Sequence, residues 1–364
     1  MAESDDDLTR FVESMTGDGA LRVEEELGDG FVKLRIGEAE RRQAKHDIRC
    51  VEDAVVEMLR NARDAGARRI FVATGREGDL RTLVVLDDGE GIPEPLHAKV
   101  FEARVTSKLE SVHMDRWGVH GRGMALYSIS QNAVEARVVA SAPGKGSVLK
   151  VVTDATQLAE KADQSTWPTV GSDEEGRTDV VRGPHNIVRA VCEFALESRG
   201  ACEVYLGSAA EVVATAYRRV RPHISEADVL FLDDLSSLPV VERLAVSGDA
   251  SELAANACAL GLEISGRTAH RIVSGQVKPL RSVAGRLLGT RSHGDAAHAP
   301  SEVDLGKDRR GLKMSREDVD AFARMLERDF SFVSERYYLQ LKGIPRVRVS
   351  AGRLVVTFDV TNEE

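Results

Sequence analysis

The segment 51–67, VEDAVVEMLRNARDAGA, constrains the fold more than any other part of the chain. Its apolar residues recur at steps of three and four, which predicts an amphipathic helix with one buried face. These residues are Val51, Val55, Met58, Ala62 and Ala65. The same helical steps place Glu57, Asn61 and Asp64 on one polar line beside that face. Gly66 is placed to end the helix. Taken alone, the polar line also fits an ordinary solvated helix face.

Composition narrows the class of protein. The chain has 364 residues, enough for two or three domains, and its 42% hydrophobic and 30% charged content is typical of globular proteins. The net charge is -10, so any basic surface must be local. The cysteines form no CxxC pair, which argues against zinc or a disulfide framework and favours small core residues in a reducing cytoplasm. They are Cys50, Cys192, Cys202 and Cys258.

The acidic start of the chain lacks the apolar core of a signal peptide. No apolar run approaches the length of about 20 residues that spans a bilayer. We therefore expect a cytoplasmic protein with no membrane partner.

A carboxylate followed by alternating glycines stands at the end of an apolar run, 82–86. Asp87 would accept a hydrogen bond from an exocyclic amine such as that of adenine. Gly89 and Gly91 lack a Cβ atom, so the backbone there can approach a flat ring. Ile92 is the next residue in the sequence. A plain Asp-Gly turn is the alternative.

Two further segments carry groups suited to phosphate. Thr106, Ser107 and Lys108 offer two hydroxyls and an ammonium on a flap that would close over a phosphate. The second segment exposes backbone N–H groups through its glycines and then enters a helix, which predicts an anion site. It matches neither the P-loop nor the dinucleotide-binding pattern. Its residues are Gly118, Val119, His120, Gly121, Arg122, Gly123 and Met124.

These motifs occur in one order: the Glu57–Asn61–Asp64 helix, then Asp87 with its glycines, then the glycine segment. Their ordered set resembles the GHKL ATPases, which include type II topoisomerases, heat-shock chaperone ATPases, sensor histidine kinases and MutL. The resemblance covers residues 45–153. The motifs look most like those of MutL and topoisomerase VI B subunit-like ATPases. The helix and the Thr-Ser-Lys segment resemble those of MutL, whereas the glycine segment is closer to the topoisomerase or chaperone form. Asp88 stands where MutL-like proteins often have Asn.

The resemblance implies an α+β fold of the Bergerat type, an α/β sandwich with helices on one face of a mixed sheet. It implies ATP and Mg²⁺ as ligands. Asn61 would supply an oxygen to Mg²⁺, Asp87 would bind the adenine amine, and Lys108 would reach the γ-phosphate. The remaining nucleotide-binding candidates are Asp64, Gly89, Gly91, Ile92, Thr106, Ser107 and residues 118–124.

Glu57 lies one helical turn before Asn61, where its carboxylate would activate the attacking water. Kinases of this family pass the phosphoryl group to protein and need no such base, so Glu57 favours hydrolysis. The competing interpretation is that Glu57 only pairs with Arg60 or Arg63. The segment 46–49 is similar to the phosphoacceptor box of sensor kinases, but it lies too close to Asn61. We therefore expect His46 at the start of a helix.

The rest of the chain is predicted as a series of smaller regions. Polar residues at 157–184 are typical of a linker. A helix, a strand and a helix are expected at 186–197, 201–206 and 208–219, in the position of a transducer domain, with Lys278, Lys307 and Lys313 as candidate γ-phosphate lysines. Short hairpins are expected at 23–36, 133–153 and 347–360, and a helix at 317–330.

The chain is expected to divide into five parts. These are a flexible N-terminus at 1–20, the ATPase domain at 21–155, a linker at 156–185, an α/β region at 186–245 and a helical region at 246–364.

Segments 251–260 and 266–273 resemble a helix-turn-helix. From 265 to 292 the charged residues are all basic, which predicts a patch for nucleic-acid phosphates around Arg267 and Arg271. A helical hairpin with a solvated face is the alternative.

The sequence therefore predicts a Mg²⁺-dependent GHKL ATPase that acts as an ATP-driven conformational or dimerisation switch on a client, with DNA as a candidate partner. The alternatives are a histidine or serine protein kinase of the same fold, or a DNA-binding regulator that senses ATP without hydrolysing it.

Overall fold

The computed structural model describes residues 23–107, 113–116, 118–120, 123–172, 178–220, 222, 234–288, 316–330, 334, 337, 339–350 and 353–362. The chain divides into two compact units, Met1–Gly294 and Asp295–Glu364. The candidate site lies in the first unit.

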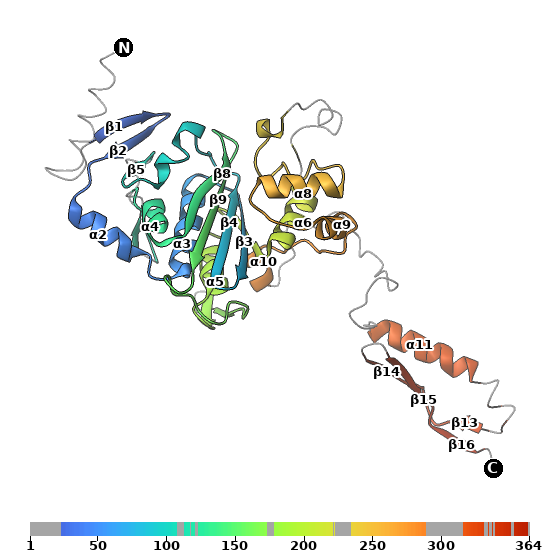
Figure 1. The fold of residues 1–364 in the computed structure, drawn as a ribbon. Coiled ribbons are helices and arrows are strands. Elements are labelled where there is room, and N and C mark those ends of the chain that lie inside the picture. The colour runs from blue at the N-terminus through green and yellow to red at the C-terminus, as the bar shows by residue number, and fades with distance from the viewer. Residues whose placement is uncertain are drawn as a thin grey trace. The chain divides into compact units, whose positions relative to one another are not determined.

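A five-stranded mixed sheet forms the centre of the first unit (Figure 1). Its strands, in spatial order, are β12 (Glu203–Gly207), β3 (Arg69–Glu77), β4 (Leu80–Asp87), β9 (Ser147–Asp154) and β8 (Glu135–Ser141). β12 pairs in parallel with β3, and every other pair is antiparallel. The predicted hairpin at 133–153 is β8 and β9.

Both faces of this sheet are buried, because side chains alternate between two apolar clusters. Ile70 and Val72 of β3 belong to the cluster that includes helices α3 (Val51–Asp64) and α5 (Ile187–Glu197). Phe71 and Ala73 belong to the other cluster, with helices α6 (Ala209–Arg219), α8 (Ala250–Ala259) and α9 (Gly266–Val273). Within residues 45–153, which carry the resemblance, helix residues such as Met58 and Ile129 belong to the first cluster and none to the second, as expected. The helices on the second face come from residues 209–273, and the α+β class with a mixed sheet is as predicted.

Helix α3 has the predicted apolar face. Val51, Val55 and Met58 are fully buried and Ala62 is 4% exposed, whereas Ala65 lies just after the last helical residue. Gly66 adopts a φ of 72°, so it supplies the left-handed conformation that ends the helix.

The elements around the site come mainly from residues 23–132. They are β1 (Val23–Gly28), β2 (Phe31–Leu34), α2 (Glu38–Asp47), η1 (Glu94–Leu96), η2 (Lys99–Phe101), β5 (Val105–Thr106), β6 (His113–Asp115), β7 (Gly118–His120) and α4 (Ala125–Asn132). The predicted hairpin at 23–36 is β1 and β2, and β5 extends it into a three-stranded sheet in the order β1-β2-β5. Helix α2 packs on α4.

The segment predicted as a linker is fastened to the domain over residues 155–168. Its Ala159 carbonyl accepts a hydrogen bond from Val51 N at 3.0 Å, at the start of α3. The Glu160 carboxylate binds the guanidinium of Arg81 through two hydrogen bonds of 2.9 and 3.1 Å. Gln164 joins α3 to α5, since it donates to Glu52 and accepts from Ile187 N. The hairpin of β10 (Thr169–Ser172) and β11 (Thr178–Arg182) follows.

The predicted helix, strand and helix after residue 185 are α5, β12 and α6. They belong to the central sheet and its two apolar clusters, so sheet pairing continues beyond the expected linker. The two helices expected at 251–273 are α8 and α9, and the unit also contains η3 (Leu235–Ser237) and α10 (Val283–Leu287). The five-part division of the chain stays a prediction.

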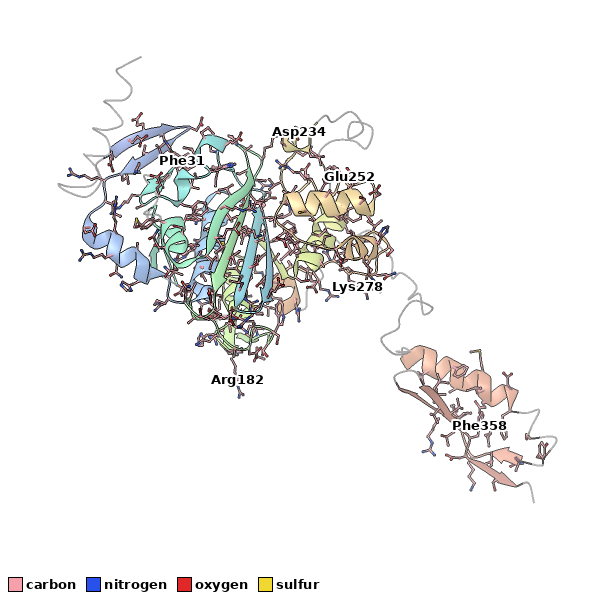
Figure 2. The ribbon with its side chains drawn as sticks, viewed as in Figure 1. Phe31, Arg182, Asp234, Glu252, Lys278 and Phe358 are labelled. Carbon is pink, nitrogen blue, oxygen red and sulfur yellow. The ribbon has the colours of Figure 1, made fainter. Side chains whose placement is uncertain are left out.

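The second unit contains α11 (Arg316–Asp329), β13 (Leu339–Leu341), β14 (Arg346–Ser350), β15 (Arg353–Thr357) and β16 (Val360–Asn362). The predicted terminal hairpin is β14 and β15, and β13 pairs with β16. Phe330, just after α11, stacks on Phe358 with ring centroids 5.2 Å apart. Phe358 is labelled in Figure 2. Across the described part of both units, no helix is long and apolar enough to cross a bilayer.

Candidate functional site

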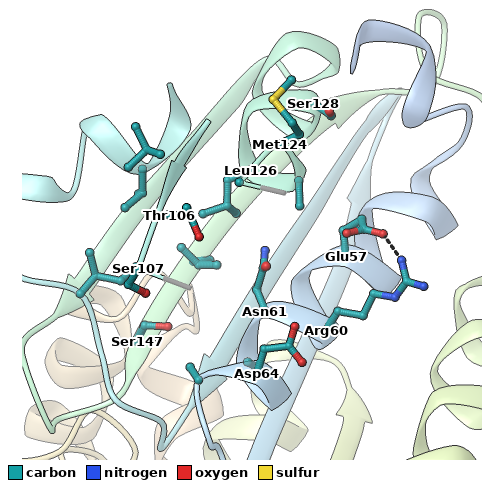
Figure 3. Close-up of a pocket in the computed structure, with 18 of the residues that line it drawn as sticks. Glu57, Arg60, Asn61, Asp64, Thr106, Ser107, Met124, Leu126, Ser128 and Ser147 are labelled. Carbon is teal, nitrogen blue, oxygen red and sulfur yellow. Dashed lines mark hydrogen bonds and ion pairs between the residues drawn. The ribbon is translucent and has the colours of Figure 1, made fainter. Parts of the chain in front are cut away.

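A cavity of about 670 Å³ lies between α3, the end of β4, β5 and the start of α4 (Figure 3). That volume is within the usual range for small-molecule sites. The predicted residues that line it are Glu57, Asn61, Asp64, Asp87, Gly91, Ile92, Thr106, Ser107, Gly123 and Met124. Segments far apart in the sequence therefore converge on one cavity, whereas Gly89 is not among the described residues that line it.

The polar line of α3 forms one wall of the cavity. Figure 3 shows Glu57, Asn61 and Asp64 along the helix, with Thr106, Ser107 and Ser147 across from them. The Nδ2 atom of Asn61 is buried and has no hydrogen-bond partner among the described residues. A buried amide without a partner is costly, so this atom marks a place where a bound ligand or solvent is needed.

Arginines of the same helix pair with both carboxylates of the polar line. Arg60 Nη1 lies 2.5 Å from Glu57 Oε1, and the two side chains are 4% and 22% exposed. Arg63 Nε lies 3.3 Å from Asp64 Oδ1. The pairing of Glu57 with Arg60, left open by the sequence, is therefore present, and Arg60 itself lines the cavity.

Asp87 ends strand β4 and is 3% exposed. Its Oδ2 accepts a hydrogen bond from the Ser147 hydroxyl at 2.5 Å, and its Oδ1 accepts one from Gly89 N at 2.8 Å. Burial raises the pKa of Asp87 to about 6, although the hydrogen bonds from Ser147 and Gly89 act in the opposite direction. Asp87 is therefore a buried acceptor that is mostly ionised at neutral pH.

The neighbouring Asp88 has a separate, structural task. Its Oδ1 accepts from the backbone N–H groups of Arg68 and Arg69 at 2.8 and 2.7 Å, and its Oδ2 binds Arg69 Nε at 2.9 Å. These contacts fix the start of β3 to the end of β4.

The glycines after Asp87 are required by the protein's own backbone. A Cβ atom on Gly91, whose φ is 76°, would lie 2.0 Å from the carbonyl oxygen of Ala142. A Cβ on Gly89 would lie 2.7 Å from the Ala65 carbonyl oxygen. The predicted approach of these glycines to a flat ring stays a prediction, whereas their close packing on neighbouring turns is observed.

The opposite wall joins the predicted flap to the glycine segment. Thr106 pairs with Val32 of β2, and Arg104 N donates to the Gly123 carbonyl at 2.9 Å. Gly123 has a φ of 66°, and a Cβ there would lie 2.9 Å from Val105 O. Gly118, Val119 and His120 form β7. Lys108, Gly121 and Arg122 lie outside the described residues.

Sequence reasoning missed part of the cavity wall. Ser147 and Arg60 are described above, and helix α2 adds Gln43, His46 and Asp47. No feature of the sequence predicts that Ser147 lines the site. Arg60 is three residues from Glu57, so helical spacing could have placed it beside the polar line. His46 was expected at a helix start, but it lies in the last turn of α2, which is mostly polar and contributes few core residues.

The residues fit a magnesium ion that is bound chiefly through phosphate and water. Asn61 would offer Mg²⁺ its amide oxygen, and the buried Nδ2 of the same amide is a hydrogen-bond donor that suits a phosphate oxygen or a water. Mg²⁺ prefers oxygen, keeps several waters and commonly takes one or two protein ligands plus substrate phosphates.

Other predicted residues lie outside the cavity. Lys278 is exposed and does not line it, and Lys307 and Lys313 are outside the described residues. Arg267 and Arg271 are exposed on α9, as a surface patch requires.

Cys192 and Cys202 are buried as predicted, but Cys258 is exposed on α8, so it is not a core residue.

The cavity-bearing region is similar to known proteins. Residues 48–178 match the family model described as histidine kinase-, DNA gyrase B-, and HSP90-like ATPase. The DNA mismatch repair protein MutL of Thermus thermophilus is 48% identical over 83 residues, which are 23% of this chain and 15% of that protein. MutL of Acidiphilium cryptum is 41% identical over 109 residues, 29% of this chain and 18% of that protein.

The chain thus matches less than a fifth of the length of these MutL relatives. Among solved structures, the mycobacterial sensor histidine kinase MprB is 22% identical, with a TM-score of 0.21, over 34% of this chain and 75% of that chain.

Proposed function

We propose that the protein binds ATP with Mg²⁺ in this cavity and hydrolyses it, because residues 48–178 match the family model described as histidine kinase-, DNA gyrase B-, and HSP90-like ATPase. One observation carries the proposal: Asn61 and Asp87, which come from separate motifs, line the same cavity. Each has the chemistry that one end of the nucleotide needs.

The adenine end of the site would be Asp87. Its carboxylate would accept a hydrogen bond from the adenine amine, while Ser147 and Gly89 hold it in place. A buried acceptor of this kind discriminates strongly, because a base without the amine would leave it unsatisfied.

The phosphate end would lie between α3 and the wall formed by Thr106, Ser107 and Gly123. Asn61 would hold Mg²⁺, which when bound offsets the negative charge of the phosphates. Glu57 would take a proton from water as the water oxygen attacks the γ-phosphorus and ADP leaves. General-base assistance of this type is typically worth about 10²–10⁴-fold in rate.

Hydrolysis would reset a conformational switch. ATP would order the wall that contains Thr106 and Ser107, and a second copy of the chain or a client would dock on the ordered form. The support for this proposal is that β5, which contributes that wall, also pairs with the N-terminal hairpin, so a change at the phosphate end would reach β1 and β2.

The test is Glu57→Gln. Gln keeps the shape and a hydrogen-bond acceptor for the buried Arg60, whereas Glu57→Ala would leave a buried guanidinium without this partner. The variant is expected to bind ATP as the wild type does. Its rate of ATP turnover should fall by a factor of about 100 or more. Wild-type turnover in Glu57→Gln would remove Glu57 from its role.

A kinase is the rival on the same fold. With γ-labelled ATP, the proposed ATPase releases free labelled phosphate. Label retained on protein would instead identify a phosphotransferase.

DNA is a second candidate ligand, favoured by one observation. On α9, Ala269 and Ile272 are buried, while Arg267 and Arg271 are exposed and their guanidinium groups make no ion pair with any described residue. Guanidinium groups presented in this way suit the phosphates of a duplex.

A further inference from the structure

We propose that Arg60 is a positioning residue for Glu57: it keeps the Glu57 carboxylate ionised and oriented toward the attacking water. This inference rests on the proposed hydrolysis of ATP. It assigns a task to a side chain that neither the motifs nor the family match singles out.

The geometry separates this pair from an ordinary ion pair on a helix surface. Arg60 is 3% exposed as a whole residue, and its Nη1 lies 2.5 Å from Glu57 Oε1. Both side chains line the cavity, and in Figure 3 the guanidinium meets the carboxylate at the end of the polar line beyond Asn61. An exposed pair at this spacing contributes little, but here one partner is almost fully removed from water.

Burial of a guanidinium inside a protein costs free energy, and a buried ion pair is weak evidence for stability. A helix that needed only to pack would be served equally well by an apolar residue at position 60. The cost is explained if the charge acts on Glu57. A cation at this distance favours the ionised form of the carboxylate.

The pair also fits the proton balance of the reaction. As the water oxygen bonds to the γ-phosphorus and the bond to ADP breaks, the water proton passes to the ionised Glu57. The carboxyl is then neutral, and the ion pair with Arg60 becomes a weaker hydrogen bond. Loss of that proton to solvent restores the pair, and the products are ADP, phosphate and a proton.

The experiment is single-turnover hydrolysis at saturating ATP, which keeps Asp87 engaged, measured down to the lowest pH at which the protein stays folded. ATP affinity is measured in parallel. Arg60→Met is expected to shift the acid limb of the rate profile upward by about one pH unit or more, with ATP affinity within about twofold of wild type. Arg60→Lys keeps a cation without the planar fork, so it should restore part of that shift. A merely structural role would not move the limb in this pattern.

Arg63→Met is the matched control. It removes an arginine of the same helix that pairs with another carboxylate of the polar line, Asp64, and it leaves the Arg60–Glu57 pair intact. Its acid limb is expected at the wild-type pH. A shift of equal size in Arg63→Met would overturn the inference, because the effect would then be general.

Folding of each variant is checked by thermal unfolding. If Arg60→Met does not fold, Arg60→Gln decides: it keeps a hydrogen-bond donor but no charge, so the same upward shift is expected. A folded, active Arg60→Met or Arg60→Gln with an unmoved acid limb overturns the inference and leaves the proposed function standing. Absence of ATP hydrolysis in the wild type would overturn the proposed function and this inference together.

Discussion

At the scale of single residues, Asp87 shows how burial and function oppose each other. A carboxylate that is 3% exposed is costly to ionise, and its pKa of about 6 reflects that cost. The hydrogen bonds from Ser147 and Gly89 limit the cost, so that the group remains mostly ionised near pH 7. The proposed recognition of the adenine amine would need such an ionised acceptor at this position.

This opposition predicts a pH dependence of stability without nucleotide. The folded pKa of Asp87, about 6, lies above the ordinary value of 3.8, so the folded state binds this proton more tightly. The stabilising contribution is complete below about pH 4 and is lost as pH rises through 6. The free energy of unfolding in urea, measured from pH 4 to 7, should therefore depend differently on pH in wild type and Asp87→Asn. Over that range the difference between the two proteins should change by on the order of 3 kcal/mol. Parallel curves for the two proteins would contradict a raised pKa.

Residue periodicity predicted the polar line of α3 because 3.6-residue spacing puts Glu57, Asn61 and Asp64 on one side of any helix. It could not predict Ser147. That residue begins a strand far from Asp87 in sequence and reaches it only through the β4–β9 pairing, in which Asp87 is opposite Ser147. The roles of the individual site residues stay predictions.

At the scale of elements, the loop after β4 is locked against the turn between β8 and β9. Glu90 O accepts from Gly144 N at 2.6 Å, and Ile92 N donates to the Ser141 hydroxyl at 2.7 Å. Gly91 and Gly146 allow the two backbones to approach, since a Cβ on either would lie about 2 Å from a carbonyl oxygen. The Asp-Gly turn is thus both a structural joint and part of the cavity wall.

Gly91→Ala tests this joint, with Gly144→Ala as the control. Both glycines have a φ near 70°, but a Cβ on Gly144 meets nothing within 4 Å. The control should lose about 1–2 kcal/mol from backbone strain alone. Gly91→Ala should lose about 3 kcal/mol or more, because the clash with Ala142 adds to the strain. Equal midpoints in urea unfolding would show that the close packing is relieved at little cost.

Hairpins and helices were predictable because their residues alternate or recur locally. The second apolar layer was not, although a signal existed: β3 and β4 contain continuous apolar runs such as Phe71-Val72-Ala73, which are typical of strands buried on both faces. The segment 155–168 reads as a linker because it is polar. Its polar side chains, Glu160 and Gln164, are instead the groups that fasten it.

At the scale of the whole molecule, the cavity and the exposed arginines of α9 are associated with opposite faces of one sheet in the first unit. The cavity belongs to the α3 side, whereas α9 packs on the other side through Ile272, in the cluster that includes Phe71 and Tyr205. The protein carries a net charge of -10, so attraction to a polyanion would have to come from this local surface and not from overall charge.

The DNA candidate is tested by the salt dependence of duplex binding. The double variant Arg267→Ala/Arg271→Ala should weaken binding of a short duplex and reduce the slope of log K against log salt by about two, because each phosphate contact contributes about one. The matched control is Arg182→Ala/Arg199→Ala, which removes the same charge from exposed arginines elsewhere; the Arg182 side chain points away from the body of the unit (Figure 2). This control should keep the wild-type slope, because its arginines lie off α9. Equal losses in the two double variants would mean that net charge alone matters, and absence of duplex binding by the wild type would remove DNA as a ligand.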